Sequence, residues 1–503
     1  MSASEHHRLK ARRLGIDTHS ETVVFMHKDC PVSKSEGFTS HNRIALTAGG
    51  RSVIATLYQV NSDFLGRDEA GLSDATWQRL DLKEGDTITA RHAPPVDSLA
   101  LVRSRIFGHE LSGPALNQII SDVVAGRYSA IEISSFVTAC TASPLSHAEI
   151  CALTHAMVDS GERLHWDRPV IVDKHSVGGL PGNRTTPIIV AIVTALGLIM
   201  PKTSSRAITS PAGTADTMEC LAPVDLDAET IRKVVEREGG CIAWGGAVQL
   251  SPADDILIGI ERALDIDSEG QMIASILSKK IAAGVTHLIL DMPVGPTAKV
   301  RTPESAASLS TGLLSVAQSF GIKARVVQGD GSQPIGRGIG PALEARDVLA
   351  VLQCDPGAPL DLRARALSLA GTVLELSGRA PDGGGVALAA SVLDDGRAWT
   401  KFQRICEAQG GMRTPPKSKY HETLAAASRG TLVGIDNRRL SKLAKLAGAP
   451  EDKAAGIELH VRLGEKLAPG APLCTLHAEA SGELAYALDY ANANADLFEI
   501  AQP

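Results

Sequence analysis

The sequence predicts an α/β protein with a separate all-helical domain, and three observations support this prediction. Strand-like and helix-like segments alternate from about residue 169 to about residue 350, which is typical of a mostly parallel central sheet with helices on both faces. The periodicity is helical instead from about residue 97 to residue 163. Short alternating apolar and polar stretches fill residues 1–94, which predicts a small N-terminal β-rich domain.

Composition limits the class of protein. A chain of 503 residues is long enough for about three domains. Its net charge of −7 argues against a protein that coats nucleic acid. The eight cysteines are scattered without a C-x-x-C pair, so neither a zinc site nor a disulfide framework is indicated. The longest apolar run is too short for a membrane span, and the N-terminus lacks an apolar signal core. We therefore expect a soluble cytoplasmic protein.

The first helical segments carry their own start signals. Ser129 and Glu132 have the spacing of a capping box, and so do Ser146 and Glu149. Gly161 is expected to end the helix that follows the second box. Before these helices, the pair Pro94 and Pro95 marks a linker. After about residue 416, short alternating pieces return, which indicates a further subdomain.

An anion site is predicted where the strand at residues 170–172 ends. Lys174, His175 and Ser176 follow the strand directly, and Gly178 and Gly179 come next. Glycines allow backbone amides to face an anion at close range. We expect Thr186 to cap the following helix, so that the positive helix end points back at the glycine turn. This combination most simply binds phosphate.

A second loop repeats the arrangement after a strand that is expected to end at Met200. Hydroxyls and a guanidinium follow there, namely Ser204, Ser205, Arg206, Thr209, Ser210 and Thr214. Ligands of open α/β sheets bind at the carboxyl ends of strands, so both loops should face one site. Neither a P-loop nor a dinucleotide fingerprint is present in this stretch.

Further along the chain, Ser275 and Lys279 are four residues apart and share one face of a predicted helix. A hydroxyl and an ammonium group on one face can contact the polar edge of a base. A lysine on a solvated helix surface is the alternative interpretation.

The motifs KHS-x-GG and SSRAITSPAGTAD resemble those of the pyrimidine-nucleoside phosphorylase family, which includes thymidine phosphorylase and AMP phosphorylase. The resemblance covers roughly residues 96–503. It implies a helical domain at 96–163 that residues 254–283 rejoin. It also implies an α/β phosphate-binding domain at 165–253 and 285–415, and a C-terminal α+β subdomain at 416–503. A homodimer formed through the helical domain is expected from the same resemblance.

The resemblance also assigns roles to residues. Phosphate binding is implied for Lys174, Ser176, Gly178, Gly179, Thr186, Ser204 and Thr214. Base binding is implied for His175, Arg262, Ser275 and Lys279, although Arg262 stands two residues closer to Ser275 than in short thymidine phosphorylases. Lys299 is expected to reach the ligand. His175 and Asp267 are the catalytic candidates, with Asp267 either protonating the leaving base or capping a helix.

The implied reaction is phosphorolysis of thymidine to thymine and 2-deoxyribose 1-phosphate, with inorganic phosphate as co-substrate and neither metal nor cofactor. The alternative is phosphorolysis of AMP or another nucleoside 5′-monophosphate to free base and ribose 1,5-bisphosphate. In that case Ser205, Arg206, Ala207, Ile208, Thr209 and Ser210 would form the substrate-binding loop. A non-catalytic nucleotide sensor and an enzyme like anthranilate phosphoribosyltransferase remain open at this point, and no nucleic-acid or membrane partner is expected.

Overall fold

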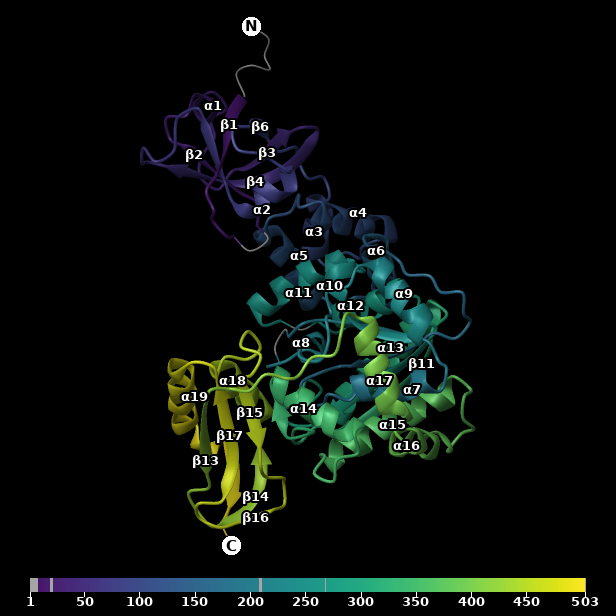
Figure 1. The fold of residues 1–503 in the computed structure, drawn as a ribbon. Helices are drawn as coiled ribbons and strands as arrows, with labels where there is room; N and C mark the ends of the chain where they lie inside the picture. Colours follow the sequence, from purple (N-terminus) through teal and green to yellow (C-terminus); the bar gives the residue numbers. More distant parts are fainter. Residues whose placement is uncertain (1–7, 19–20, 208–209, 267, 503) are drawn as a thin grey trace. The chain divides into compact units, whose positions relative to one another are not determined.

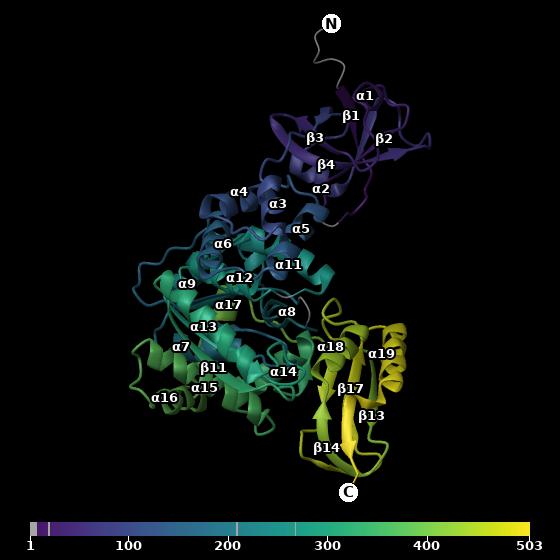
Figure 2. The same ribbon diagram turned by 180° about the vertical axis from the view of Figure 1, so that it is seen from behind.

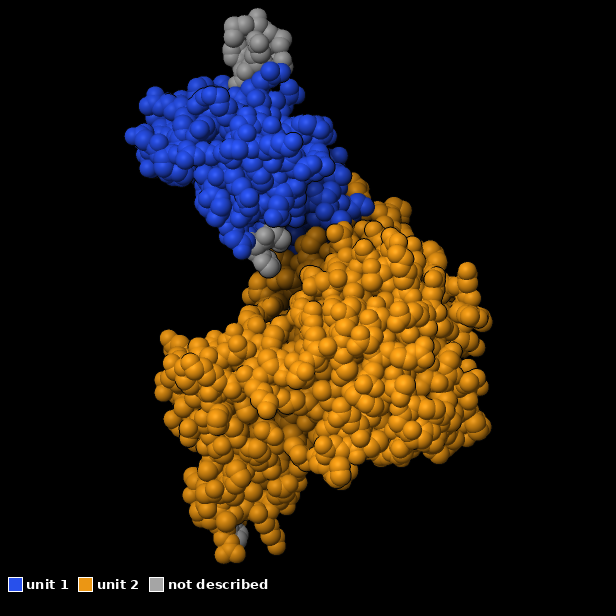
Figure 3. All heavy atoms as spheres, viewed as in Figure 1, with its two compact units in different colours: residues 1–107, 121–136 blue, residues 108–120, 137–503 orange. Residues whose placement is uncertain are grey.

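The computed structural model describes residues 8–18, 21–207, 210–266 and 268–502. The chain divides into two compact units, which Figure 3 shows in two colours. The first comprises residues 1–107 and 121–136, and the second comprises residues 108–120 and 137–503. No helix among the described residues is both long enough and apolar enough to cross a membrane.

The first unit contains a closed six-stranded barrel with the strand order β1-β5-β2-β4-β3-β6. Its strands are β1 (Arg8–Arg13), β2 (Val23–His27), β3 (Arg43–Ala48), β4 (Arg51–Val60), β5 (Glu69–Leu72) and β6 (Thr87–His92). The short helices α1 (Pro31–Ser35) and α2 (Asp74–Leu80) accompany them. Inward residues such as Leu46 and Ile88 are fully buried, and most of the outward residues of β3 and β6 are polar. The predicted N-terminal β-rich fold is confirmed.

Helices follow the barrel in the chain: α3 (Leu99–Ile106), α4 (Gly113–Val124), α5 (Ala130–Ala142) and α6 (His147–Asp159). The capping box at Ser146 and Glu149 is present at the start of α6, as the sequence predicts. Two later helices, α11 (Pro252–Leu264) and α12 (Glu269–Ala282), pack against α6. Segments far apart in sequence therefore form one helical layer in the second unit.

The central sheet of the second unit is parallel, as predicted. β11 (Lys323–Asp330), β10 (His287–Val294) and β7 (Val172–Ser176) pair in that order. β8 (Met200–Ser204) pairs with β9 (Gly240–Trp244), and a parallel bridge between Ile171 and Ile199 connects the two sets of strands. The carboxyl ends of β7, β8 and β10 therefore meet at one edge of the sheet.

Two strands are displaced from their predicted positions. β7 begins at Val172 and continues through Ser176, so Lys174 lies within the strand instead of after it. β8 begins at Met200, where the sequence analysis expected a strand to end. Both strands bury charged residues, Asp173 and Lys174 on β7 and Lys202 on β8, that an apolar pattern cannot reveal. Ion pairs with distant parts of the chain make this burial tolerable.

Helices cover the sheet (Figures 1 and 2). α7 (Thr186–Ala195) and α15 (Leu360–Leu376) pack on its strands through a large aliphatic core, and α13 (Pro303–Ser319) packs on β10 and β11. The remaining helices here are α8 (Thr214–Glu219), α9 (Ala228–Glu238), α10 (Gly245–Val248), α14 (Pro341–Leu352), α16 (Gly385–Asp394) and α17 (Arg397–Ala408). The predicted cap of α7 is wrong by one residue, because the helix begins at Thr186 and Thr185 is the N-cap, without a side-chain cap bond.

The C-terminal part is an α+β subdomain. Its two small sheets have the strand orders β12-β15-β17-β13 and β16-β14-β18. The elements are β12 (Gly338–Ile339), β13 (Tyr420–Ala425), β14 (Gly430–Ile435), α18 (Asn437–Leu446), β15 (Gly456–Leu459), β16 (Lys466–Leu467), β17 (Pro472–Ala478), α19 (Ser481–Ala493) and β18 (Phe498–Ala501). β12 lies at the end of the glycine-rich segment 329–340 and pairs with β15, so this segment joins the C-terminal sheet to α14, which lies beside it in both views.

Candidate active site

Lys174 lies at the centre of a buried ion-pair network. Its Nζ is 2.9 Å from Oδ2 of Asp291 and donates a hydrogen bond of 3.0 Å to Oγ1 of Thr185. Arg365 pairs with the other oxygen of Asp291. Burial alone would raise the pKa of Asp291, but Lys174 and Arg365 outweigh it and lower this pKa to about 2. The carboxylate stays ionised and holds both cations beside the end of β7.

The neighbouring residue Asp173 forms a second buried cluster. Side chains alternate along a strand, so Asp173 points to the opposite face from Lys174. Nζ of Lys280 on α12 is 2.6 Å from Oδ2 of Asp173, and Nζ of Lys202 is 3.3 Å from Oδ1. The two clusters together hold four basic side chains, Lys174, Lys202, Lys280 and Arg365, and only two carboxylates. Such an excess of positive charge suits an anion.

His175 is half-buried between these groups. Burial lowers its pKa well below the ordinary value of 6.5, and Lys280, Lys202, Lys279 and Lys174 lower it further. The imidazole is therefore neutral at neutral pH. It can donate one hydrogen bond to a substrate atom, but it does not serve as an imidazolium acid there.

The two loops that were predicted to face one site contact each other. They are called the first bend, residues 174–186, and the second bend, residues 204–214. Arg184, which belongs to the first bend, donates from Nη1 to Oγ1 of Thr214 at 2.8 Å and from Nη2 to the carbonyl of Ala212 at 2.9 Å. Its Nε binds Oε2 of the buried Glu344 at 2.6 Å. The guanidinium group of Arg184 thus connects the first bend to the start of α8 through hydrogen bonds.

The glycine turn itself depends on positive backbone angles. Gly178 and Gly179 have φ values of +96° and +82°. A β-carbon on Gly179 would lie 2.1 Å from the backbone nitrogen of Lys299. The loop that carries Lys299 therefore packs directly on the turn, and the role of Lys299 in reaching the ligand stays a prediction. Oγ of Ser176 accepts a hydrogen bond of 3.4 Å from Asn183 in the same bend, and Thr186 is buried there.

The second bend is closed by its own contacts. Asp216 accepts from the amides of Ala207 and Gly213 at 2.7 Å and 2.9 Å. Arg206 forms a forked pair with Glu219 at 2.8 Å and 2.9 Å and lies over the ring of Trp244. Oγ of Ser204 donates to the carbonyl of Ser205, and Ser210 donates to that of Ala212. The predicted residues Ile208 and Thr209 lie outside the described residues.

Ser275 and Lys279 are brought together on α12. Nζ of Lys279 lies 3.3 Å from Oγ of Ser275 and 2.5 Å from Oδ2 of the buried Asp254 on α11. Lys279 is also among the charges that lower the pKa of His175, after burial and two other lysines. Arg262 is exposed near the end of α11, and the pKa of Lys445 is lowered first by burial and then by the charge of Arg262. Asp267 lies outside the described residues, and Ser268 is the N-cap of α12.

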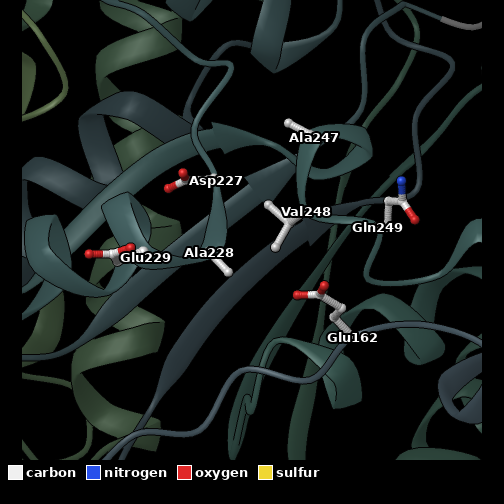
Figure 4. Close-up of a pocket in the computed structure, with 7 residues that line it drawn as sticks. All are labelled: Glu162, Asp227, Ala228, Glu229, Ala247, Val248 and Gln249. Carbon is white, nitrogen blue, oxygen red and sulfur yellow. The ribbon is translucent and has the colours of Figure 1, made fainter. Parts of the chain in front are cut away.

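A surface pocket lies elsewhere. Figure 4 shows it, lined by Glu162, Asp227, Ala228, Glu229, Ala247, Val248 and Gln249. The charged side chains in this lining are carboxylates, which would repel phosphate. None of the sequence-predicted site residues lines it.

Sequence reasoning missed the residues that hold the site together: Asp173, Asn183, Arg184, Thr185, Lys202, Lys280, Asp291 and Arg365. A signal existed for Asp291, because it directly follows the apolar run of residues 288–290. Lys280 stands next to the predicted Lys279, and Thr185 stands next to Thr186. No local pattern pointed to Arg365, whose partner lies 74 residues away in the chain.

Comparison with known families agrees with this geometry. Residues 99–161 match the helical bundle domain of a glycosyl transferase family, and residues 168–399 match its a/b domain. Residues 431–497 match the C-terminal domain of pyrimidine nucleoside phosphorylases. The fold and these two matches therefore define a glycosyl transferase.

Relatives that match nearly the whole chain identify the family within this class. The chain is 60% identical to a protein of Sphingopyxis alaskensis named "Putative thymidine phosphorylase", over 98% of this chain and 96% of that protein. It is 58% identical to proteins of the same name from Polaromonas sp. and Chelativorans sp., again over at least 97% of both chains. The chain belongs to the thymidine and pyrimidine-nucleoside phosphorylase family, a family of pentosyltransferases.

Solved structures show the same fold at lower similarity. Anthranilate phosphoribosyltransferase from Thermus thermophilus is 21% identical, with a TM-score of 0.52 over 61% of this chain and 98% of that one. The enzyme from Saccharomyces cerevisiae is 16% identical, with a TM-score of 0.51 over 63% and 98%. This likeness concerns the arrangement of the helical and α/β parts.

Proposed function

We propose that the protein catalyses the phosphorolysis of thymidine to thymine and 2-deoxyribose 1-phosphate. The observation that carries this proposal is the convergence of the two bends through Arg184 beside a buried excess of positive charge. The names of relatives that are 57–60% identical over nearly the whole chain support the same substrate.

In the proposed reaction, a phosphate oxygen attacks C1′ of the deoxyribose while the bond from C1′ to the base nitrogen breaks. The phosphate would be held by Lys174, Ser176, Ser204, Thr214 and the amides of the glycine turn. Charge-assisted hydrogen bonds of this kind are stronger than neutral ones. Fixing phosphate and sugar in line can remove about 7–11 kcal/mol from the barrier.

The electron pair of the broken bond goes to the base, which leaves as an anion. We propose that Lys279, Ser275 and neutral His175 donate hydrogen bonds to this anion. Lys279 is oriented by Asp254, at 2.5 Å, so that its ammonium group can oppose the developing negative charge. Where a positioned group transfers a proton in the transition state, it contributes about 10²- to 10⁴-fold.

The alternative with a nucleoside 5′-monophosphate needs additional donors in the loop of residues 205–210. Arg206, its strongest donor, is already bound to Glu219, Asp216 and Asp225. This commitment fits thymidine better than AMP. The homodimer, the cytoplasmic location and the lack of a cofactor stay predictions.

The test supplies the enzyme and inorganic phosphate with thymidine, uridine, AMP or CMP in separate reactions and measures the free base released. We expect thymine from thymidine, and no release without phosphate. Release from AMP or CMP alone would contradict the proposed substrate, and binding without any release would favour a nucleotide sensor.

A further inference from the structure

Two lysines share one carboxylate beneath the proposed phosphate site. Asp173, Lys202 and Lys280 are exposed by 0%, 4% and 2%, respectively. Lys280 is 2.6 Å and Lys202 is 3.3 Å from the carboxylate oxygens of Asp173. With both lysines protonated, this group carries one positive charge in excess, and burial away from water makes such a charge costly.

Lys202 is the member of the group that reaches the site. Its Nζ donates a hydrogen bond of 2.9 Å to the carbonyl oxygen of Lys174. Lys202 also stands two residues before Ser204, on the strand that leads into the second bend. An anion gripped by the two bends would therefore lie near this ammonium group.

Several charged or titratable groups lie near Lys202 or near its neighbour His175. They are Asp173, Lys174 and His175 on β7, Lys280 and Lys279 on α12, and Cys241 on the neighbouring strand β9. Of these described groups, only Asp173 is an anion near neutral pH, since burial raises the pKa of the Cys241 thiol to about 12. Burial lowers the pKa of Lys202 to about 7, Asp173 opposes this change, and Lys280 adds to it. Lys202 therefore exchanges its proton with solvent close to neutral pH.

We propose that Lys202 is a positioning residue that takes up a proton when phosphate binds, so that its ammonium group balances the bound anion and holds the carbonyl of Lys174. This inference rests on the proposed function, because it requires phosphate at this edge of the sheet. By linkage, an anion that favours the protonated lysine must bind more weakly as the pH rises.

Sulfate is the probe that separates titration of the lysine from titration of the ligand, because sulfate does not titrate near neutral pH whereas phosphate does. We would titrate the full-length enzyme with sulfate at pH 7.5 by calorimetry, in buffers of different ionisation enthalpy. We expect uptake of about half a proton or more per sulfate, and a sulfate Kd that rises by up to about tenfold from pH 7 to pH 8. Lys202→Met should abolish the uptake and flatten the pH dependence, although Lys174 and His175 remain.

Two further variants complete the test. Lys202→Gln keeps a donor for the carbonyl of Lys174 without a titrating group, so it replaces Lys202→Met if that variant does not fold, and it should also lose the uptake. Lys401→Met is the matched control, because Lys401 is a largely buried lysine 3.2 Å from Glu238 and outside the site. It should keep the uptake of the unaltered enzyme.

The outcomes distinguish this inference from the proposed function. Proton uptake that is absent in the unaltered enzyme, or that persists in both Lys202 variants, overturns the inference. If thymine is still released in a phosphate-dependent reaction, the proposed function survives that result. An enzyme that binds neither sulfate nor phosphate and releases no base refutes both.

Discussion

Asp291→Asn removes one charge from the centre of the site with almost no change in shape. Asp291 is fully buried and accepts from Lys174 at 2.9 Å, from Asn183 at 3.1 Å and from Arg365. The amide cannot accept from all of these donors, because one of its two positions is itself a donor. Lys174 and Arg365 would then be buried beside a neutral group.

The size of the effect follows from the structure. Lowering the pKa of Asp291 from 3.8 to about 2 corresponds to about 2.5 kcal/mol of stabilisation. Breaking a buried ion pair by removing one partner typically costs about 3–5 kcal/mol. We therefore expect Asp291→Asn to reduce the free energy of opening of β7 and β10 by about 2.5–5 kcal/mol at pH 7.

Hydrogen exchange measured on peptides from these two strands reports the free energy of opening directly. Exchange should accelerate by at least about 50-fold in the variant. Because the folded pKa of Asp291 is lowered, its contribution is present above pH 3.8 and is lost as the pH falls toward about 2, so the two proteins should converge below pH 4. Asp330→Asn is the control, since Asp330 is exposed at the end of the adjacent β11 and should change stability by less than about 0.5 kcal/mol. Equal exchange in Asp291→Asn and the unaltered protein would refute the central role of this carboxylate.

Three further predictions concern the site. His175→Ala should lower kcat/KM for thymidine by about 10- to 100-fold, the value of one hydrogen bond to a charged group, and should leave the pH profile between 6.5 and 8 unchanged because His175 is already neutral there. An activity limb near pH 6.5 that disappears in this variant would contradict the lowered pKa. Arg184→Lys should raise KM for phosphate by about tenfold, since an ammonium group cannot hold Thr214, Ala212 and Glu344 at once, and steady-state kinetics with unchanged phosphate KM would disprove the bridging role. Lys453→Met should cost less than about 1 kcal/mol in urea unfolding, because Arg206 still neutralises Glu219, and a loss of several kcal/mol would contradict this.

The parts of the fold that could be predicted from the sequence are those with local causes. The capping box of α6 lies within four residues, and the start of α9 after Asp227 is equally local. The meeting of the two bends followed from topology alone, because parallel strands end at one edge. The parallel bridge between Ile171 and Ile199 makes β7 and β8 neighbours in the sheet, in agreement with this expectation.

The parts that could not be predicted depend on partners far away in the chain. Apolar periodicity placed the end of β7 too early, because Asp173 and Lys174 look like loop residues until Lys280 and Asp291 are seen to neutralise them. The same reason explains the shifted β8, whose Lys202 is buried against Asp173. Charges on strands escape a pattern that scores hydrophobicity.

Backbone contacts around the glycine turn have a consequence for how this enzyme can change. Any side chain at Gly179 would collide with the main chain at Lys299, and one at Gly182 would come within 2.1 Å of the carbonyl of Ile335. Three loops from separate strands are thus interlocked with no space for a single methyl group. Laboratory selection for a new substrate should leave these glycines untouched and draw its successful substitutions from other positions.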